Sequence, residues 1–146
     1  EWERAARGTE QHTYPWGNAS PSCKLANLFP KRRSAVYNDL PLPRKGFCTQ
    51  GTLPVTAHGE AAIAQLAGNV AEWVSDWYAP GYYRDGPTIE PRGPATGTLG
   101  IVRGGSWMDE APRLRSGHRQ LLKPETRRSS VGFRCARSLP APDNKR

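Results

Sequence analysis

The chain has 146 residues, of which 36% are hydrophobic, 9% aromatic and 23% charged, a length that suits one domain better than two. Its 15 Gly and 14 Pro make up about a fifth of the residues, against a usual share of roughly 12%. Five Trp and five Tyr argue against intrinsic disorder, because disordered chains lack such side chains. The absence of any long apolar run excludes a transmembrane helix. We expect a compact, loop-rich domain with aromatic anchors.

The net charge of +8 is concentrated in the last third of the chain. Residues 101–146 hold eleven Lys and Arg against four Asp and Glu, whereas residues 1–100 hold ten against nine. A basic segment can attract nucleic acid. Nine of the eleven basic residues are Arg, however, and the planar guanidinium group suits ion pairs with carboxylates and carbonyls. We therefore expect scaffold and partner contacts from these arginines, and no nucleic-acid binding.

The predicted elements are short and separated by long loops. Residues 1–7 are good helix formers that stop at Gly8, a residue suited to ending a helix. Residues 30–54 are rich in proline and basic residues and predict a surface loop, and residues 79–98 predict a second one. Strand-like stretches follow at 68–78, 101–107, 113–119 and 131–137. The pattern is typical of irregular antiparallel β-structure.

Three isolated cysteines exclude a CxxC metal knuckle. A disulfide between Cys23 and Cys48 would close a loop of about 25 residues and stabilise the fold by ~3 kcal/mol. The alternative is three buried thiols in a cytosolic protein. We favour the disulfide between Cys23 and Cys48, with Cys135 unpaired. Such a disulfide would indicate an exported or periplasmic protein.

No P-loop, GxGxxG or GxSxG motif is present. Two other stretches have unusual sequences that call for a structural or functional explanation. In Gly68–Glu72, the carbonyls of Gly68 and Val70 and the Glu72 carboxylate would suit Ca²⁺, which takes oxygen ligands from flexible loops. The alternative is that Glu72 pairs with one of the arginines. In the Arg103–Trp107 stretch, the Gly pair predicts either a bulged core strand or the floor of a cleft.

Several motifs occur in the order and spacing of one family. They are Glu1-Trp-Glu-Arg-Ala-Ala-Arg-Gly8, Tyr14-Pro-Trp-Gly17, Gly68-Asn-Val-Ala-Glu-Trp73, Val102-Arg-Gly-Gly-Ser-Trp107 and Gly132-Phe-Arg-Cys-Ala136. With them the chain resembles the C-terminal part of a formylglycine-generating-enzyme (sulfatase-modifying factor) domain. The resemblance implies an irregular α+β architecture, a variant of the C-type-lectin-like fold with short, mainly antiparallel strands and long loops.

The resemblance also implies a partial domain. Residues 1–137 correspond to the C-terminal portion, and residues 138–146 form a polar tail. A full family domain has an N-terminal part that precedes the Glu-Trp-Glu motif, so we expect a companion fragment or a protein partner.

Founding members of the family oxidise a substrate cysteine to formylglycine, with copper held between two cysteines shortly after the Gly-Gly-Ser motif. In this chain no cysteine follows Ser106 until Cys135. Without soft thiolate ligands a Cu(I) site of that type cannot form, so we expect no copper and no formylglycine generation. Ser106 matches an active-site position of the family but is not assigned a catalytic role.

The resemblance carries over one calcium site. Its ligands would be the carbonyls of Gly68 and Val70 and the side chains of Glu72 and Gln65, where Gln65 replaces a family Asn. The preferred function is a non-catalytic, calcium-stabilised binding or accessory module, of a kind found in bacterial proteins, for a small ligand or peptide. The alternative is part of an oxidase-type enzyme, formylglycine-generating or sulfoxide-synthase-like, whose catalytic residues lie on a missing N-terminal part or a separate chain.

Overall fold

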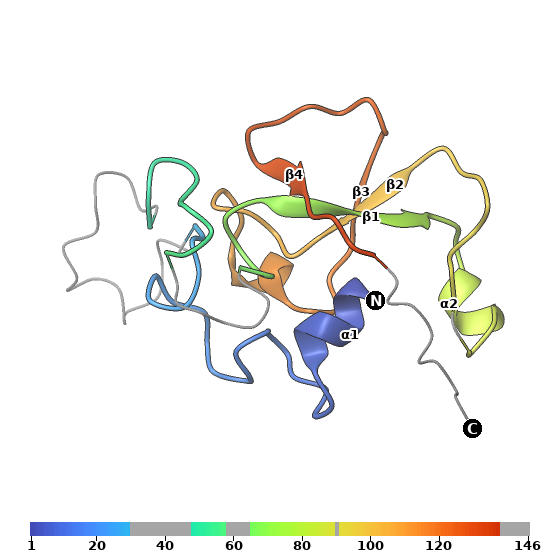
Figure 1. Ribbon diagram of the computed structural model, residues 1–146, viewed down its shortest axis with the longest axis horizontal. Helices are drawn as coiled ribbons and strands as arrows, with labels where there is room; N and C mark the ends of the chain where they lie inside the picture. Colours follow the sequence, from blue (N-terminus) through green and yellow to red (C-terminus); the bar gives the residue numbers. More distant parts are fainter. Residues whose placement is uncertain (30–47, 58–64, 90, 138–146) are drawn as a thin grey trace, which may run out of the picture.

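The computed structural model describes residues 1–29, 48–57, 65–89 and 91–137 (Figure 1). The predicted tail at 138–146 and most of the loop predicted at 30–54 lie outside these residues. In chain order the elements are helix α1 (Trp2–Arg7), strand β1 (Ala71–Trp77), helix α2 (Tyr82–Asp85), strand β2 (Gly100–Arg103), a 3-10 helix η2 (Ala111–Leu114), strand β3 (Gln120–Leu122) and strand β4 (Val131–Phe133).

The four strands form one mixed sheet in the order β3-β2-β1-β4. β2 pairs antiparallel with both β1 and β3, whereas β4 pairs parallel with β1. The mainly antiparallel sheet that the resemblance implied is confirmed, with two antiparallel pairings and one parallel pairing. β4 can pair parallel with β1 because a long stretch of chain, which includes β2 and β3, connects these two strands.

The predicted helix is present, and strands β1, β2 and β4 overlap the predicted stretches 68–78, 101–107 and 131–137. α1 ends at Gly8, whose φ of 63° lies in the left-handed region and whose N–H donates to the Arg4 carbonyl. β1 is rich in Trp and Val, which favour strands. At Gly100 of β2, a Cβ atom would lie 2.7 Å from the Trp73 ring, so glycine lets this indole pack flat on the neighbouring strand.

The strand predicted at 113–119 is wrong. Residues 111–114 form η2, with Pro near its first turn, where its fixed φ favours a helical start. The Ser116 N–H donates to Thr13 and the Ser116 carbonyl accepts from Arg103, so this backbone is used for contacts outside a sheet. β3 begins only at Gln120.

Two small hydrophobic clusters form the core. The first contains Ala26, Leu28, Ala67 and Leu114, with Tyr14, Trp16 and Cys48 packed against it. The second, on the sheet, contains Ala71, Val102 and Leu122, with Trp73 and Val131. A disulfide joins Cys23 to Cys48 beside the first cluster, as the sequence favoured, and Cys135 is free and exposed.

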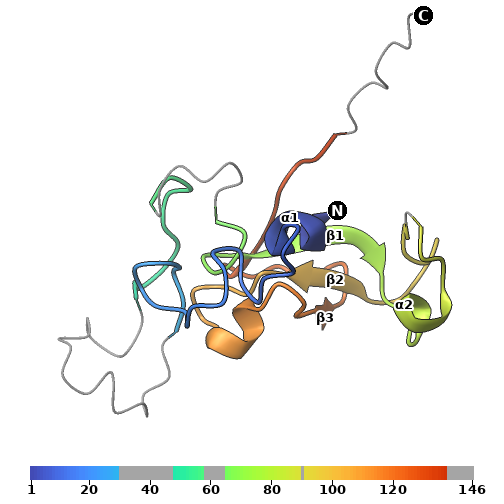
Figure 2. The ribbon, with the colours of Figure 1, turned by 90° about the horizontal axis from the view of Figure 1, so that it is seen from below.

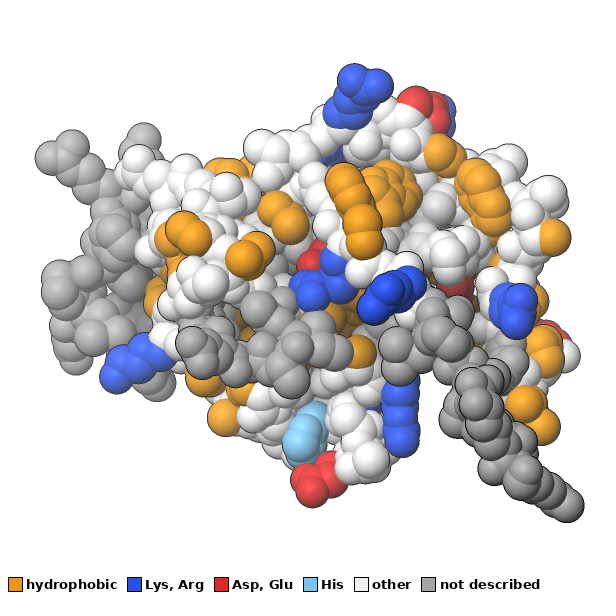
Figure 3. Space-filling model, viewed as in Figure 1, with side chains coloured by type: hydrophobic (Ala, Val, Ile, Leu, Met, Phe, Trp, Pro, Cys, Tyr) orange, Lys and Arg blue, Asp and Glu red, His pale blue; other side chains and the backbone are white. Residues whose placement is uncertain are grey.

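The surface carries apolar side chains as well. Hydrophobic side chains gather on the face of Figure 3 that lies over β1 and β4, and Phe133 of β4 is 76% exposed. None of the helices in the described ranges is long and apolar enough to cross a membrane.

Candidate functional site

The turn that leads into β1 has an unusual backbone. Gln65, Gly68 and Asn69 all have positive φ values, of 49°, 77° and 63°. A Cβ atom at Gly68 would lie 2.5 Å from the Asn27 carbonyl oxygen, so only glycine fits this close approach. The Asn69 side chain fixes the turn by bonding both the N–H and the carbonyl of Leu53. This turn therefore sets the position of the residues that follow.

Glu72 of β1 is buried, and both of its carboxylate oxygens accept hydrogen bonds. Its Oε2 accepts hydrogen bonds from Trp2 Nε1 at 2.8 Å and Arg134 Nε at 2.7 Å, and its Oε1 accepts from Arg134 Nη2 at 2.6 Å. The two parallel bonds from the guanidinium make a bidentate, charge-assisted pair. The structure thus contains the arginine pairing that the sequence left open, and Trp2 completes it from α1.

Gln65 contacts the same guanidinium nitrogen that donates to Glu72 Oε1. Its main-chain oxygen faces Arg134 Nη2 at 3.5 Å, and its side-chain Nε2 donates to the Pro54 carbonyl at 2.6 Å. Its Oε1 is buried and, among the described residues, accepts no hydrogen bond. Gln65 and Glu72 thus meet at Arg134, while Gly68 and Val70 lie between them in the turn.

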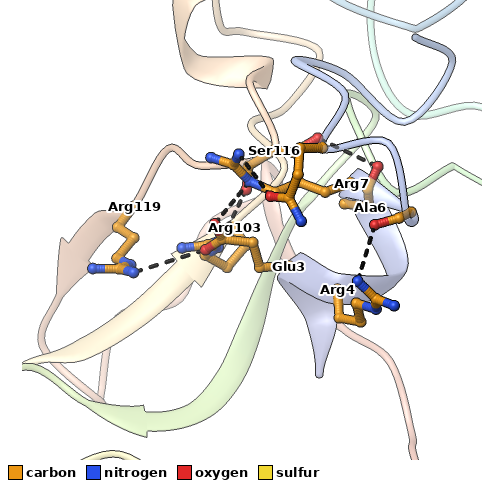
Figure 4. A network of polar contacts seen from close by, with 9 residues as sticks. Glu3, Arg4, Ala6, Arg7, Arg103, Ser116 and Arg119 are labelled. Atoms are coloured by element: carbon orange, nitrogen blue, oxygen red, sulfur yellow. Dashed lines mark hydrogen bonds and ion pairs between the residues drawn. The ribbon is translucent and has the colours of Figure 1, made fainter. Parts of the chain in front are cut away.

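A polar network attaches α1 to β2 around a single carboxylate (Figure 4). The Glu3 oxygens contact Arg7 Nε at 2.8 Å, Arg103 Nη2 at 2.5 Å and Arg119 Nη2 at 3.7 Å. Arg103 is 4% exposed and also donates to the Ser116 carbonyl. Burial acts to raise the pKa of Glu3, but the hydrogen bond from Arg103 and the charges of the three arginines together hold it below its usual value.

This network predicts an acid-sensitive contact. Because the pKa of Glu3 is lower in the folded protein, its contribution is complete above the ordinary glutamate pKa of about 4.3 and is lost as the pH falls through the folded value. In Glu3→Gln we expect a lower melting temperature at pH 7 and a flatter loss of stability below pH ~4. Thermal melts at several pH values check this, and parallel profiles for the two proteins would contradict it.

The residues from Ser106 to Asp109, which follow β2, form a turn that side-chain hydrogen bonds hold together. The Ser106 N–H and Oγ both donate to Asp109 Oδ2, at 3.0 and 2.7 Å, and Asp109 Oδ1 accepts from Arg113 Nη1 at 3.3 Å. A Cβ atom at Gly104 would lie 2.5 Å from the Leu66 carbonyl oxygen. The close backbone approach predicted from the Gly pair is therefore present.

Ser106 lines a cavity of about 790 Å³. The cavity walls come from the loop before η2, from η2 and from the sheet strands β1, β3 and β4. The lining residues are Phe29, Ala71, Ser106, Met108, Asp109, Glu110, Pro112, Arg113, Gln120, Arg128, Ser130 and Val131. This volume is within the range of small-molecule sites. Of the stretch 103–107, Ser106 alone lines it, because the Cβ positions of Gly104 and Gly105 face the backbone of Leu66 and Arg113. The Gly pair therefore fits the bulged core strand better than the floor of a cleft.

The irregular α+β architecture and the mixed sheet define a variant C-type-lectin-like fold, and solved structures share it. The chain superposes on PvdO from Pseudomonas aeruginosa with a TM-score of 0.65 at 24% identity, over 90% of this chain and 48% of that one. It superposes on variable protein 1 of Treponema denticola with a TM-score of 0.58 at 28% identity, over 91% and 43%.

Comparison of the amino-acid sequence identifies the family within this fold. Residues 1–139 match the sequence model of the FGE-sulfatase family, described as a sulfatase-modifying factor enzyme 1-like domain. The chain belongs to this family, as its motifs indicated.

Three relatives show the range of the family. The chain is 36% identical to the formylglycine-generating enzyme of Streptomyces coelicolor, over 93% of this chain and 44% of the relative. It is 31% identical to the inactive C-alpha-formylglycine-generating enzyme 2 of Mus musculus, over 97% and 42%. It is 32% identical to the serine/threonine-protein kinase pkn1 of Chlamydia caviae, over 95% and 20%. The chain thus spans less than half the length of each.

Proposed function

We propose that this chain is a non-catalytic binding module whose ligand site is the cavity over Ser106. The observation that carries the proposal is the set of hydrogen bonds that the Asp109 carboxylate accepts. Its carboxylate holds the Ser106 hydroxyl and N–H and an arginine, so the turn is a closed hydrogen-bonded unit. No cysteine lines this cavity, and Cys23 and Cys48 are bonded to each other. The existence of a relative named as inactive supports a family role without oxidation.

A blocked peptide tests the binding site. We expect N-acetyl-leucyl-leucine amide to bind weakly, because Met108, Pro112 and Val131 offer apolar wall. Ser130→Trp, on the wall, should obstruct the cavity and abolish saturation transfer from protein to peptide in NMR. Glu125→Trp is the matched control, since it is exposed on the same loop and does not line the cavity. Equal binding by both variants would contradict the assignment.

The alternative is part of an oxidase-type enzyme, and the 36% identity to a formylglycine-generating enzyme favours it. Its catalytic residues would lie on the remainder of a domain of that length. Because those residues are not in this chain, the test is the intact mass of the natively purified protein before and after denaturation: a second, non-covalently held polypeptide would support this alternative over the binding module.

We also propose that calcium stabilises the module at Gln65, Gly68, Val70 and Glu72. The buried Gln65 Oε1 without a donor is an oxygen ligand of the kind that calcium takes. Among the described residues Glu72 Oε1 accepts one hydrogen bond, which leaves it a lone pair. With one carboxylate beside the Arg134 guanidinium, the site has little negative charge, and we expect a dissociation constant of about 10⁻⁴–10⁻³ M.

Calcium should therefore raise the melting temperature only at millimolar concentration. The shift should disappear in Gln65→Met, which keeps the side-chain length and removes the oxygen. Magnesium at equal concentration is the control for ionic strength. Identical melting curves of the unmutated protein in calcium and in chelator would contradict the proposal.

Two further features bear on where and with what the module works. The Cys23–Cys48 disulfide supports an exported location, because disulfides persist in oxidising compartments. The exposed Phe133 and the greater length of the relatives support a companion, the rest of a family-length domain, that packs against this surface.

A further inference from the structure

The charged side chains in the cavity over Ser106 are of two kinds. Asp109 is satisfied within the protein, since its carboxylate accepts bonds from Ser106 and Arg113. Within the described part of the chain the Arg113 side chain makes this one polar contact, at 3.3 Å, and it is 51% exposed. These contacts hold the turn and leave the Asp109 carboxylate little capacity for a ligand.

Glu110 and Arg128 are different. Both line the cavity, Glu110 half-buried and Arg128 exposed, and among the described residues neither side chain takes part in a hydrogen bond or an ion pair. They come from separate segments, since Glu110 precedes η2 and Arg128 lies in the loop between β3 and β4. The cavity thus offers a ligand one unused anion and one unused cation.

The remainder of the wall narrows the class of ligand. Met108, Pro112 and Val131 supply apolar surface to the same cavity. The four charged lining residues are two acids and two arginines, so the wall has no net charge. A purely anionic ligand would meet the unused Glu110 carboxylate, and a purely cationic one would meet the unused Arg128 guanidinium. A ligand with both charges satisfies both sides.

We propose that the cavity binds a small zwitterion with an apolar body, of the size of a short peptide with free termini. Its ammonium pairs with Glu110, and its carboxylate pairs with Arg128, whose planar guanidinium matches a carboxylate bidentately. This assignment rests on the proposed function, since it names the ligand class for the same cavity. A volume of about 790 Å³ accommodates such a molecule.

The test matches each protein charge with one ligand charge. The ligands are leucyl-leucine, its N-acetyl derivative, its amide and the doubly blocked form, and the proteins are unmutated, Glu110→Gln and Arg128→Gln. We expect acetylation to weaken binding about tenfold in the unmutated protein and to have no effect in Glu110→Gln. Amidation should weaken binding similarly and have no effect in Arg128→Gln. Glu125→Gln and Arg127→Gln are matched controls on the exposed β3–β4 loop.

The outcomes separate the two proposals. If all four ligands bind with equal affinity and Ser130→Trp abolishes that binding, the cavity is a ligand site but the zwitterion assignment is wrong. If blocking either end weakens binding equally in every variant, the two named residues do not read the ligand charges. If none of the four ligands binds, the zwitterion assignment fails together with the proposed peptide-sized site.

Discussion

Replacing Glu72 with glutamine should destabilise the protein by about 3 kcal/mol, because it leaves the Arg134 guanidinium and the Trp2 indole facing a neutral amide. The Glu72 side chain is 7% exposed, whereas Arg134 is 33% exposed, which places the expected loss at the low end of the range for broken buried pairs. The melting temperature should fall by roughly 6–12 °C. Thermal denaturation followed by circular dichroism measures it.

A double-mutant cycle isolates the pair. Arg134→Gln alone should also destabilise the fold, and the double variant should lose less than the sum of the two single losses. Glu125→Gln, at an exposed position, should change stability by less than about 0.5 kcal/mol. If Glu72→Gln melts at the same temperature as the unmutated protein, the bidentate pair contributes nothing and our description of this site is wrong.

Removal of the disulfide should have an effect of similar size. The bond joins residues 25 positions apart, and closing a loop of that length is worth ~3 kcal/mol by the chain-entropy estimate. The double variant Cys23→Ser/Cys48→Ser should therefore melt roughly 6–12 °C below the unmutated protein. Adding a reductant to the unmutated protein should produce the same fall.

Thiol labelling provides the independent check. Iodoacetamide should modify Cys135 alone before reduction, because Cys135 is the free and exposed thiol, and all three cysteines after reduction and denaturation. Cys135→Ser should leave the melting temperature nearly unchanged. Labelling of Cys23 or Cys48 in the unreduced protein would show that the bond does not form.

The sequence predicted best what local patterns determine. The helix that ends at Gly8, the strand around Trp73 and Trp77 and the Gly pair after β2 follow from propensity and turn chemistry. The stretch 113–119 was wrong because its alternating arginines imitate a strand, whereas the contacts of Ser116 with Thr13 and Arg103 use its backbone. Such long-range hydrogen bonds leave no periodic signal.

The site was predictable only in part, for the same reason. The sequence offered Glu72 two partners, a cation in the turn or an arginine. The actual partners, Trp2 and Arg134, are 70 and 62 residues away. Both belong to motifs that were noted, yet nothing in either motif says that they meet. The sequence did not identify Glu110 and Arg128 as candidate binding residues. Unpaired charged residues can be related to a ligand only when the fold shows that they line the same cavity.

β1 separates two chemically unlike environments by a single layer of backbone. Ala71 lines the cavity, and its neighbour Glu72 is bonded to Arg134 and Trp2, since successive side chains of a strand point to opposite faces. A shift of β1 by one residue would exchange the two faces completely. An insertion or deletion of one residue in β1 should therefore disrupt the cavity wall and the Glu72 ion pair together.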